Sequence, residues 1–203
     1  LCVNAIVDRG FGWLAHEGLQ ARVRALPFAV EVLAALFVAD LVQYAVHRAF
    51  HEVPWLWRFH AIHHSVRTID WLAGSRLHVV ETIATRAAVL GPLTVLGFSR
   101  EAMDAFVIVV GVQAVLVHAN LRLPIGPLRH VWATPQWHHW HHASDREALD
   151  RNYAVTFPVI DHLFGTAIRG LGDRMPRAYG LHGETVPEGF VAQLAWPFRR
   201  RRP

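Results

Sequence analysis

The sequence has no lysine and a single cysteine, Cys2, among its 203 residues. One cysteine excludes an internal disulfide framework and any cysteine-rich zinc site. Charged residues make up 18% of the chain against 53% hydrophobic residues, a balance that excludes intrinsic disorder and favours a membrane protein over an ordinary soluble domain. The chain also lacks a G-x-G-x-x-G fingerprint, so it offers no motif of this kind for binding a dinucleotide.

The basic residues are all arginine, and they give the chain a formal net charge of +4. They are scattered along the sequence, apart from a run at 199–202. No basic stripe with interleaved aromatic residues is present, so we expect no nucleic-acid partner. A basic tail of this kind is typical of segments that lie beside anionic lipid headgroups.

Three long apolar stretches, at about 27–46, 79–98 and 102–117, are each near the length that crosses a bilayer as a helix. Acidic residues inside a span are costly, so we expect Glu31 and Asp40 to face the interior of a helix bundle. The sequence therefore predicts an all-α fold, a helical transmembrane bundle with a cytosolic His-rich helical cap.

We expect one domain over 1–203, with His-rich parts at 47–78 and 118–170 and a basic tail at 171–203. Most arginines lie in the parts outside the spans, on one side, and the positive-inside rule makes that side cytoplasmic. The prediction is an integral, multi-pass membrane protein with its histidine motifs on the cytoplasmic side. The alternative is a soluble all-helical protein with buried helices, because the apolar stretches are short and interrupted by charge.

Histidine is the residue in surplus, with 15 copies. It occurs as an H-x-x-x-H pair, as two H-x-x-H-H clusters, and at the end of the third apolar stretch: His47 and His51; His60, His63 and His64; His138, His141 and His142; and His118. Residues three and four apart share one face of a helix, so each cluster would point its imidazoles at one place. Asp40 and Tyr44 continue the stripe of the first pair and are suited to orienting its ligands. The pattern predicts metal binding.

The remaining histidines have a simpler interpretation as hydrogen-bonded side chains without a metal: His16, His130, His162 and His182. His139 lies within a cluster but off its spacing, so we expect it to support the ligands or to lie at the surface. Six tryptophans crowd the same regions and are interpreted as an interfacial belt: Trp55, Trp57, Trp71, Trp132, Trp137 and Trp140.

Nine imidazoles exceed the four ligands of a structural zinc site, so two ions fit the number better. Imidazole binds zinc, copper, iron and nickel alike, and ligand type alone does not choose among them. A pair of membrane haems would need isolated histidines on facing helices, whereas His63 and His64 are adjacent.

Several motifs in this order resemble the fatty acid hydroxylase / sterol desaturase superfamily of integral-membrane non-haem di-iron oxygenases: DLVQYAVHRAFH, LWRFHAIHHS, RLHVVE, HANL, TPQWHHWHHA and DRNYA…DHLFGT, between Asp40 and Thr166. The resemblance implies two iron ions, held by the nine histidines named above, with His78 as a tenth candidate. It also implies support of these ligands by Asp40, Glu81, Asp150 and Asn152. No catalytic residue beyond the ligands is expected. Val79, Ala154 and Ile160 stand where the family usually has Pro, Gly and Trp. These departures concern the subfamily and remove none of the expected ligands.

The activity implied is O2-dependent hydroxylation or desaturation of a membrane lipid, a fatty acyl lipid, a sterol or a related molecule. Such chemistry on an unactivated C–H bond needs a redox metal. Electrons would come from a partner, a ferredoxin or a cytochrome b5-type protein with its reductase. Two other classes stay open at this point: a non-catalytic membrane protein that binds or transports metal, and a haem-binding electron carrier.

Overall fold

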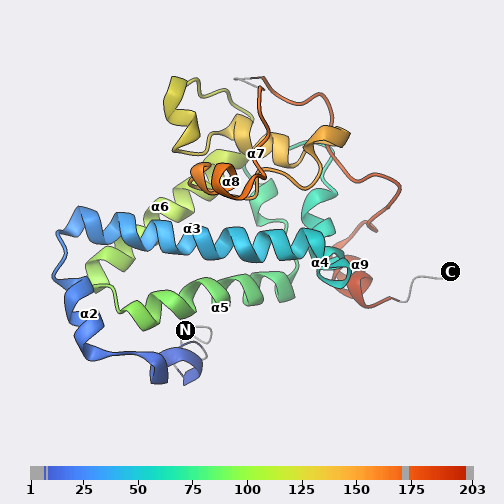
Figure 1. Ribbon diagram of the computed structural model, residues 1–203. Coiled ribbons are helices and arrows are strands. Elements are labelled where there is room, and N and C mark those ends of the chain that lie inside the picture. Colours follow the sequence, from blue (N-terminus) through green and yellow to red (C-terminus); the bar gives the residue numbers. More distant parts are fainter. Residues whose placement is uncertain (1–6, 8, 171–173, 200–203) are drawn as a thin grey trace.

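The computed structural model describes residues 7, 9–170 and 174–199, and in this part of the chain the regular elements are helices (Figure 1). The longer helices are α2 (Glu17–Arg24), α3 (Phe28–Glu52), α4 (Pro54–His64), α5 (Val79–Leu96), α6 (Arg100–His118), α7 (Pro135–His141), α8 (Val159–Phe164) and α9 (Phe190–Ala195). Short 3₁₀ turns lie at Gly12–Leu14, Ala73–Ser75, Gly126–His130, Arg146–Ala148 and Trp196–Phe198. The predicted all-α fold is confirmed.

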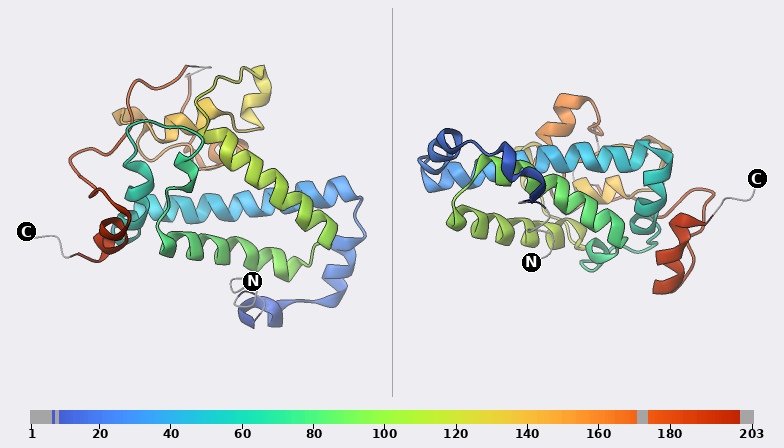
Figure 2. Two further views of the ribbon diagram at one scale, coloured as in Figure 1. Left: turned by 180° about the vertical axis from the view of Figure 1, so that it is seen from behind. Right: turned by 90° about the horizontal axis from the view of Figure 1, so that it is seen from below.

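Helices α3, α5 and α6 are long and apolar enough to cross a membrane. Helix α3 is central, since it packs against α4, α5 and α6, and the two further views in Figure 2 place these helices side by side. The expected spans agree with these helices, except that α3 continues beyond the predicted end at 46 as far as Glu52. The first histidine pair is therefore part of the same helix as the first span.

The turn between α5 and α6 is fixed by short-range capping and by one buried carboxylate. Gly97 ends α5 with a φ of 68°, a left-handed conformation that glycine adopts without a steric penalty. Ser99 caps α6 by accepting a hydrogen bond from the N–H of Ala102. Glu31 of α3 accepts hydrogen bonds from the backbone N–H and the hydroxyl of Ser99, at 2.5 and 2.8 Å. Both Glu31 and Asp40 are buried, as expected for acids within a span.

The segment before α3 packs against the far end of α5, away from α4 (Figure 1). The amide of Gln20 donates to the carbonyl groups of Thr94 and Val95. The ring of Phe11 lies so close to Gly91 that an added Cβ would meet it at 3.0 Å. The beginning of the described chain and the histidine-rich helices therefore lie at opposite ends of the bundle.

A second layer, formed by α7, α8 and their connections, lies along α3 and α6 (Figure 1). Two buried carboxylates hold the irregular segment 153–157 in this layer. Asp40 accepts from the N–H groups of Val155, Thr156 and Phe157 at 2.6–3.1 Å, and Asp161 accepts from those of Tyr153 and Ala154 at 2.8 and 2.7 Å. Because an ionised oxygen strengthens these bonds, the segment is held firmly against the centre of α3.

The C-terminal part returns to α4, where α9 and the turn at 196–198 lie. Arg58 of α4 donates to the carbonyl groups of Trp196 and Arg199. The rest of the basic run, 200–202, and residues 171–173 of the predicted tail lie outside the described residues.

Candidate metal centre

Nine histidines converge from four helices into two groups, in each of which the possible ligand atoms lie within 4.8 Å of one another. The first group consists of His47, His51, His60, His64 and His141, and the second of His63, His118, His138 and His142. These are the nine histidines predicted as ligands. Helices α3, α4, α6 and α7 supply eight of them, and His142 directly follows α7.

The two H-x-x-H-H motifs contribute to both groups, in opposite ways. In α4, His60 and His64 belong to the first group and His63 to the second. In the α7 motif, His138 and His142 belong to the second group and His141 to the first. Each motif thus gives an i, i+4 pair to one group and the residue at i+3 to the other. Two adjacent groups built in this way share both helical segments.

The loop at 150–153 orients three histidines of the first group. Nδ1 of His51 lies 3.1 Å from a carboxylate oxygen of Asp150, and Nδ1 of His141 lies 2.8 Å from the carbonyl oxygen of Arg151. Nδ1 of His47 lies 2.8 Å from the carbonyl oxygen of Tyr153. Each oxygen accepts a hydrogen bond from Nδ1–H, which leaves the lone pair on Nε2. Asp150 and Asn152 have left-handed backbone conformations, with φ of 56° and 57°, which Asp and Asn tolerate better than most residues.

Two further histidines are oriented from α5 and α6. Glu81 lies with a carboxylate oxygen 2.5 Å from Nδ1 of His60, and the pair is buried. The carbonyl oxygen of Ala114 lies 2.7 Å from Nδ1 of His118. Oxygen partners of this kind fix the ring of a metal-binding histidine and raise its basicity.

The Nε2 atoms lie at the spacing that a shared metal ion requires. Nε2 of His47 is 3.0 Å from Nε2 of His60, and Nε2 of His118 is 3.0 Å from Nε2 of His138. In the first of these pairs both Nδ1 atoms are engaged by oxygen, so two lone pairs face each other and form no hydrogen bond. Two nitrogens bound to one ion at about 2.0–2.1 Å lie roughly 3 Å apart. The residues present therefore fit a metal ion in each group.

Burial favours the neutral form of the five clustered histidines His63, His64, His138, His141 and His142. Removal from water lowers the pKa of His63, His64, His138 and His142 well below the ordinary value of 6.5, and neighbouring histidines lower it further. The pKa of His141 falls to about 3, again because of burial. A neutral imidazole is the form that binds a metal.

The other predicted site residues lie around the two groups, and not all of them touch a ligand. Asp40 holds the backbone at 155–157 and contacts no clustered histidine among the hydrogen bonds of the described residues. The Tyr44 hydroxyl lies 3.0 Å from that of Thr166. The amide of Asn152 joins the carbonyl of Trp137 to the N–H of Ile168.

His78 lies outside both groups. It caps the start of α5, where its Nδ1 accepts from the N–H of Val80 at 3.1 Å. Its Nε2–H donates to the carbonyl of Leu194 at 3.2 Å. Both ring nitrogens are thus engaged in holding α5 and the C-terminal helix, and the structure does not bring His78 to the metal groups.

The histidines expected to have no metal role lie away from the groups or beside them. His139 is fully buried, with Nδ1 2.8 Å from the hydroxyl of Tyr179. His130 and His162 contact each other through ring nitrogens 3.3 Å apart, and His16 is exposed. His182 contacts the carbonyl of Ser144. Of the tryptophans, Trp55 and Trp71 are largely exposed, whereas Trp140 is buried and donates to the carbonyl of Arg174.

Asp161 is a site residue that the sequence analysis did not single out. It is completely buried and fixes the backbone of Tyr153, the residue whose carbonyl engages His47. Its carboxylate also accepts from the hydroxyl of Thr166 at 2.6 Å. The sequence did point to this residue, because Asp161 and Thr166 are the first and last residues of the DHLFGT motif that carries part of the family resemblance.

Two cavities open toward the histidines from different sides. One, of about 300 Å³, lies between α3, α5 and α6 and reaches both groups; its walls include Leu36, Leu77, Val89, Phe106 and Val110, with His47, His60, His63, His118 and His138 at its histidine end. We call it the inter-helix cavity. A second, also about 300 Å³, is lined by His51, Trp57, His64, His141, Asp150 and His182 and reaches only the first group.

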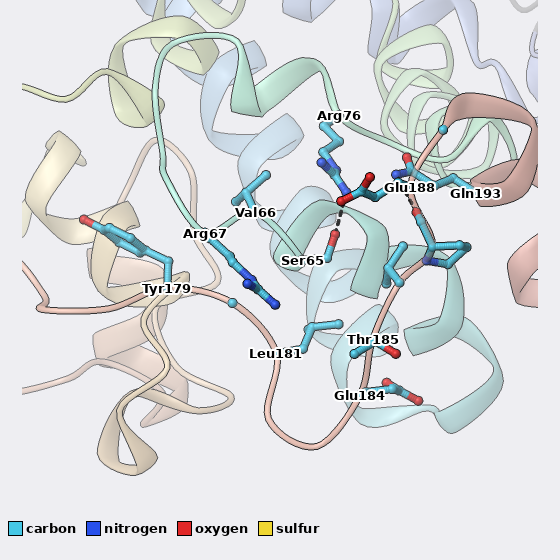
Figure 3. A pocket seen from close by; sticks show the side chains of 14 residues that line it. Ser65, Val66, Arg67, Arg76, Tyr179, Leu181, Glu184, Thr185, Glu188 and Gln193 are labelled. Atoms are coloured by element: carbon cyan, nitrogen blue, oxygen red, sulfur yellow. Dashed lines mark hydrogen bonds between the residues drawn. The ribbon is translucent and has the colours of Figure 1, made fainter.

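A further cavity, of about 580 Å³, lies between the loop after α4 and the segment before α9. Figure 3 shows Arg67 and Arg76 on the side of the loop, and Glu184 and Glu188 on the opposite segment. None of the nine clustered histidines lines it. It is therefore not the place where a metal and a ligand would meet.

The fold and the site define a helical protein with membrane-type helices and two histidine groups that could each hold a metal ion. The model of the fatty acid hydroxylase family matches residues 32–166, and the chain belongs to this family. The matched range contains every histidine of both groups. The three apolar helices and the family together indicate a membrane protein.

Curated relatives carry names from lipid oxidation. The chain is 34% identical over 179 residues to ornithine lipid hydroxylase OlsE of Rhizobium tropici, a match that covers 86% of this chain and 52% of the relative. It is 28% identical over 151 residues to alkylglycerol monooxygenase of Caenorhabditis elegans, covering 72% of this chain and 28% of the relative. It is 29% identical over 145 residues to fatty acid hydroxylase vlmA of a Lecanicillium species, covering 64% of this chain and 39% of the relative. The chain thus spans about half or less of the length of these relatives. No solved structure matches it significantly.

Proposed function

We propose that this chain is an O2-dependent lipid hydroxylase in which the two histidine groups hold two iron ions. The observation that carries the proposal is the convergence of oriented Nε2 atoms beside an apolar cavity between membrane-type helices. The names of the relatives, which are hydroxylases and monooxygenases of lipids, favour hydroxylation over desaturation.

The overall reaction converts a C–H bond, O2, two electrons and two protons into a C–OH group and water. Side chains alone do not activate O2, and iron supplies that redox chemistry when it is bound. Imidazoles carry no charge that would offset the charge of the ions, so the groups are suited to a reaction in which negative charge develops near the metals. The two electrons come from outside the chain, and a ferredoxin or a cytochrome b5-type protein with its reductase is the expected donor.

The protein's own part is to fix the ligands and to bind the substrate. The loop at 150–153 and Glu81 hold imidazole rings in one tautomer, so that little rearrangement is needed during turnover. The walls of the inter-helix cavity suit an acyl or alkyl chain, which would enter from the bilayer and exclude water from the reacting carbon.

The proposal places the histidine groups on the cytoplasmic side of the membrane. Arginine is concentrated in the parts of the sequence that follow α3 and α6, which also contain α4, α7 and α9. The positive-inside rule supports this orientation. A cytoplasmic position would also give a soluble electron donor access to the first group.

The test combines metal analysis with a product assay on protein purified in detergent from iron-supplemented cells. We expect about two irons per chain without a haem Soret band, as estimated from the ligand number. With 18O2, a reductase system and membrane lipids, mass spectrometry should detect one labelled oxygen per product. His63→Ala should lose the label and mainly one of the two irons, whereas His16→Ala, a change at an exposed histidine, should retain the label and both irons.

Three outcomes would contradict the proposal. A Soret band would identify a haem protein, and iron without label in any lipid would favour a non-catalytic metal protein. Label carried from water, measured with H2(18)O, would show that O2 is not the oxygen source.

A further inference from the structure

One face of α5 lines the inter-helix cavity with polar side chains. The lining residues are Glu81, Thr82, Thr85, Arg86 and Val89, at spacings of one, three, one and three. Such spacings place all five on one side of a helix. The polar part of this face begins beside His60 and ends at Arg86, so the cavity has a polar strip on an otherwise mainly apolar wall.

Three charged side chains line this cavity, and two of them are already engaged. Asp40 accepts three backbone N–H groups, and Glu81 lies against His60. Arg86 makes no hydrogen bond or ion pair with any residue of the described part of the chain. Its side chain is exposed. The cavity therefore contains one cation that the described protein does not neutralise.

The position of Arg86 makes this cation costly without an anion. It lies seven positions after Val79 at the start of α5, which corresponds to about 10 Å of helix. A charge at such a depth in a span is expensive, even though a long arginine side chain reaches back toward the interface. A cation kept at this place, facing a cavity, indicates an anionic ligand.

We propose that Arg86 binds the anionic group, a carboxylate or a phosphate, of the lipid whose chain occupies the inter-helix cavity. The planar guanidinium offers paired N–H donors, a geometry that matches either group. This inference rests on the proposed lipid hydroxylase function and specifies the class of its substrate. Arg86 lies five positions, or about 7.5 Å of helix, after Glu81, the residue that contacts His60. The oxidised carbon would consequently lie nearer to the anionic end of the lipid than to the far end of its chain.

Lipid binding to the full chain in detergent tests this assignment without any need for turnover. Native mass spectrometry would measure retention of two matched pairs of probes: oleate with oleyl alcohol, and oleoyl lysophosphatidate with monooleoylglycerol. Arg86→Gln should weaken retention of the anionic member of at least one pair by about tenfold and leave both neutral members unchanged. The pair that responds identifies the headgroup, and a response of both means that Arg86 recognises charge alone.

Two control variants separate this role from general effects. Arg100→Gln removes an exposed arginine at the start of α6 and should leave all four probes unchanged. Arg86→Lys keeps the charge without the paired donors and should give an intermediate loss. Equal losses for charged and neutral probes, or no loss in Arg86→Gln, would overturn the inference.

The same preparations distinguish this inference from the proposed function. If the wild-type protein incorporates label from 18O2 while Arg86→Gln binds every probe normally, only the role of Arg86 fails. If anion binding depends on Arg86 but the iron-loaded wild-type protein oxidises no lipid, the hydroxylase proposal fails and the binding site stands.

Discussion

Replacement of Asp161 by asparagine should destabilise the protein and selectively weaken the first histidine group. The buried carboxylate accepts three hydrogen bonds, from Tyr153 N–H, Ala154 N–H and the Thr166 hydroxyl, at 2.6–2.8 Å. Asparagine keeps only one accepting oxygen, and its amide would face a buried N–H. A lost charge-assisted bond costs about 1.5–3 kcal/mol, and an unsatisfied buried N–H costs about 1–3 kcal/mol more.

Burial raises the pKa of Asp161, which means that its ionised form already bears a desolvation cost. The net loss in the free energy of unfolding should therefore lie near the lower end of the sum of these two costs, at about 3 kcal/mol. For a chain of this size such a loss lowers the unfolding midpoint by about 10 °C. Thermal unfolding in detergent, followed by tryptophan fluorescence, measures the shift.

The metal content of Asp161→Asn tests the connection from this residue to the site. The carboxylate fixes Tyr153, whose carbonyl engages His47, so the first group should lose its ion and the second should retain its own. Thr166→Val is the matched control: it removes one hydroxyl from the same network, costs about 1 kcal/mol and should keep both ions. If Asp161→Asn has the lower unfolding midpoint but keeps both ions, the reasoning is refuted.

Four further substitutions have distinct expected outcomes. Glu81→Gln should weaken metal retention by about 10–100-fold in a chelator competition, because the amide is a poorer partner for Nδ1–H of His60; unchanged retention would argue against this role. His78→Ala should leave the metal content intact and cost about 1 kcal/mol of stability through loss of the α5 cap, and loss of an ion would return His78 to the ligand set. His63→Ala and His64→Ala should each remove mainly one ion, from different groups, which spectroscopy of the remaining ion can distinguish; identical residual spectra would contradict the assignment.

The sequence predicted the helices and the convergence of the nine histidines because both depend on local spacing. Three apolar stretches of nearly span length predicted α3, α5 and α6, and the i, i+3, i+4 spacing indicated which histidines would converge. Spacing did not predict how the histidines divide between two groups. That division depends on how α4 and α7 pack against each other through the rest of the bundle, which is a property of the tertiary structure.

The supporting contacts were harder to predict, for a related reason. Backbone carbonyls orient His47, His118 and His141, and a carbonyl oxygen has no sequence signature. Tyr44 continued the stripe of the first histidine pair, yet its hydroxyl contacts Thr166, because α8 and the segment after it pack there. Residue type indicates a hydrogen-bonding group, but the fold decides its partner.

The two openings toward the histidines have a consequence for the order in which reactants bind. A lipid in the inter-helix cavity would leave the opening beside His51, His64 and His141 free, since the two are lined by different residues. A small reactant dissolved in water can therefore reach the first group after the lipid has bound, or before. The shape of the protein therefore imposes no fixed order of binding. The steady-state kinetics of the proposed hydroxylase should follow a random-order scheme for the lipid and O2.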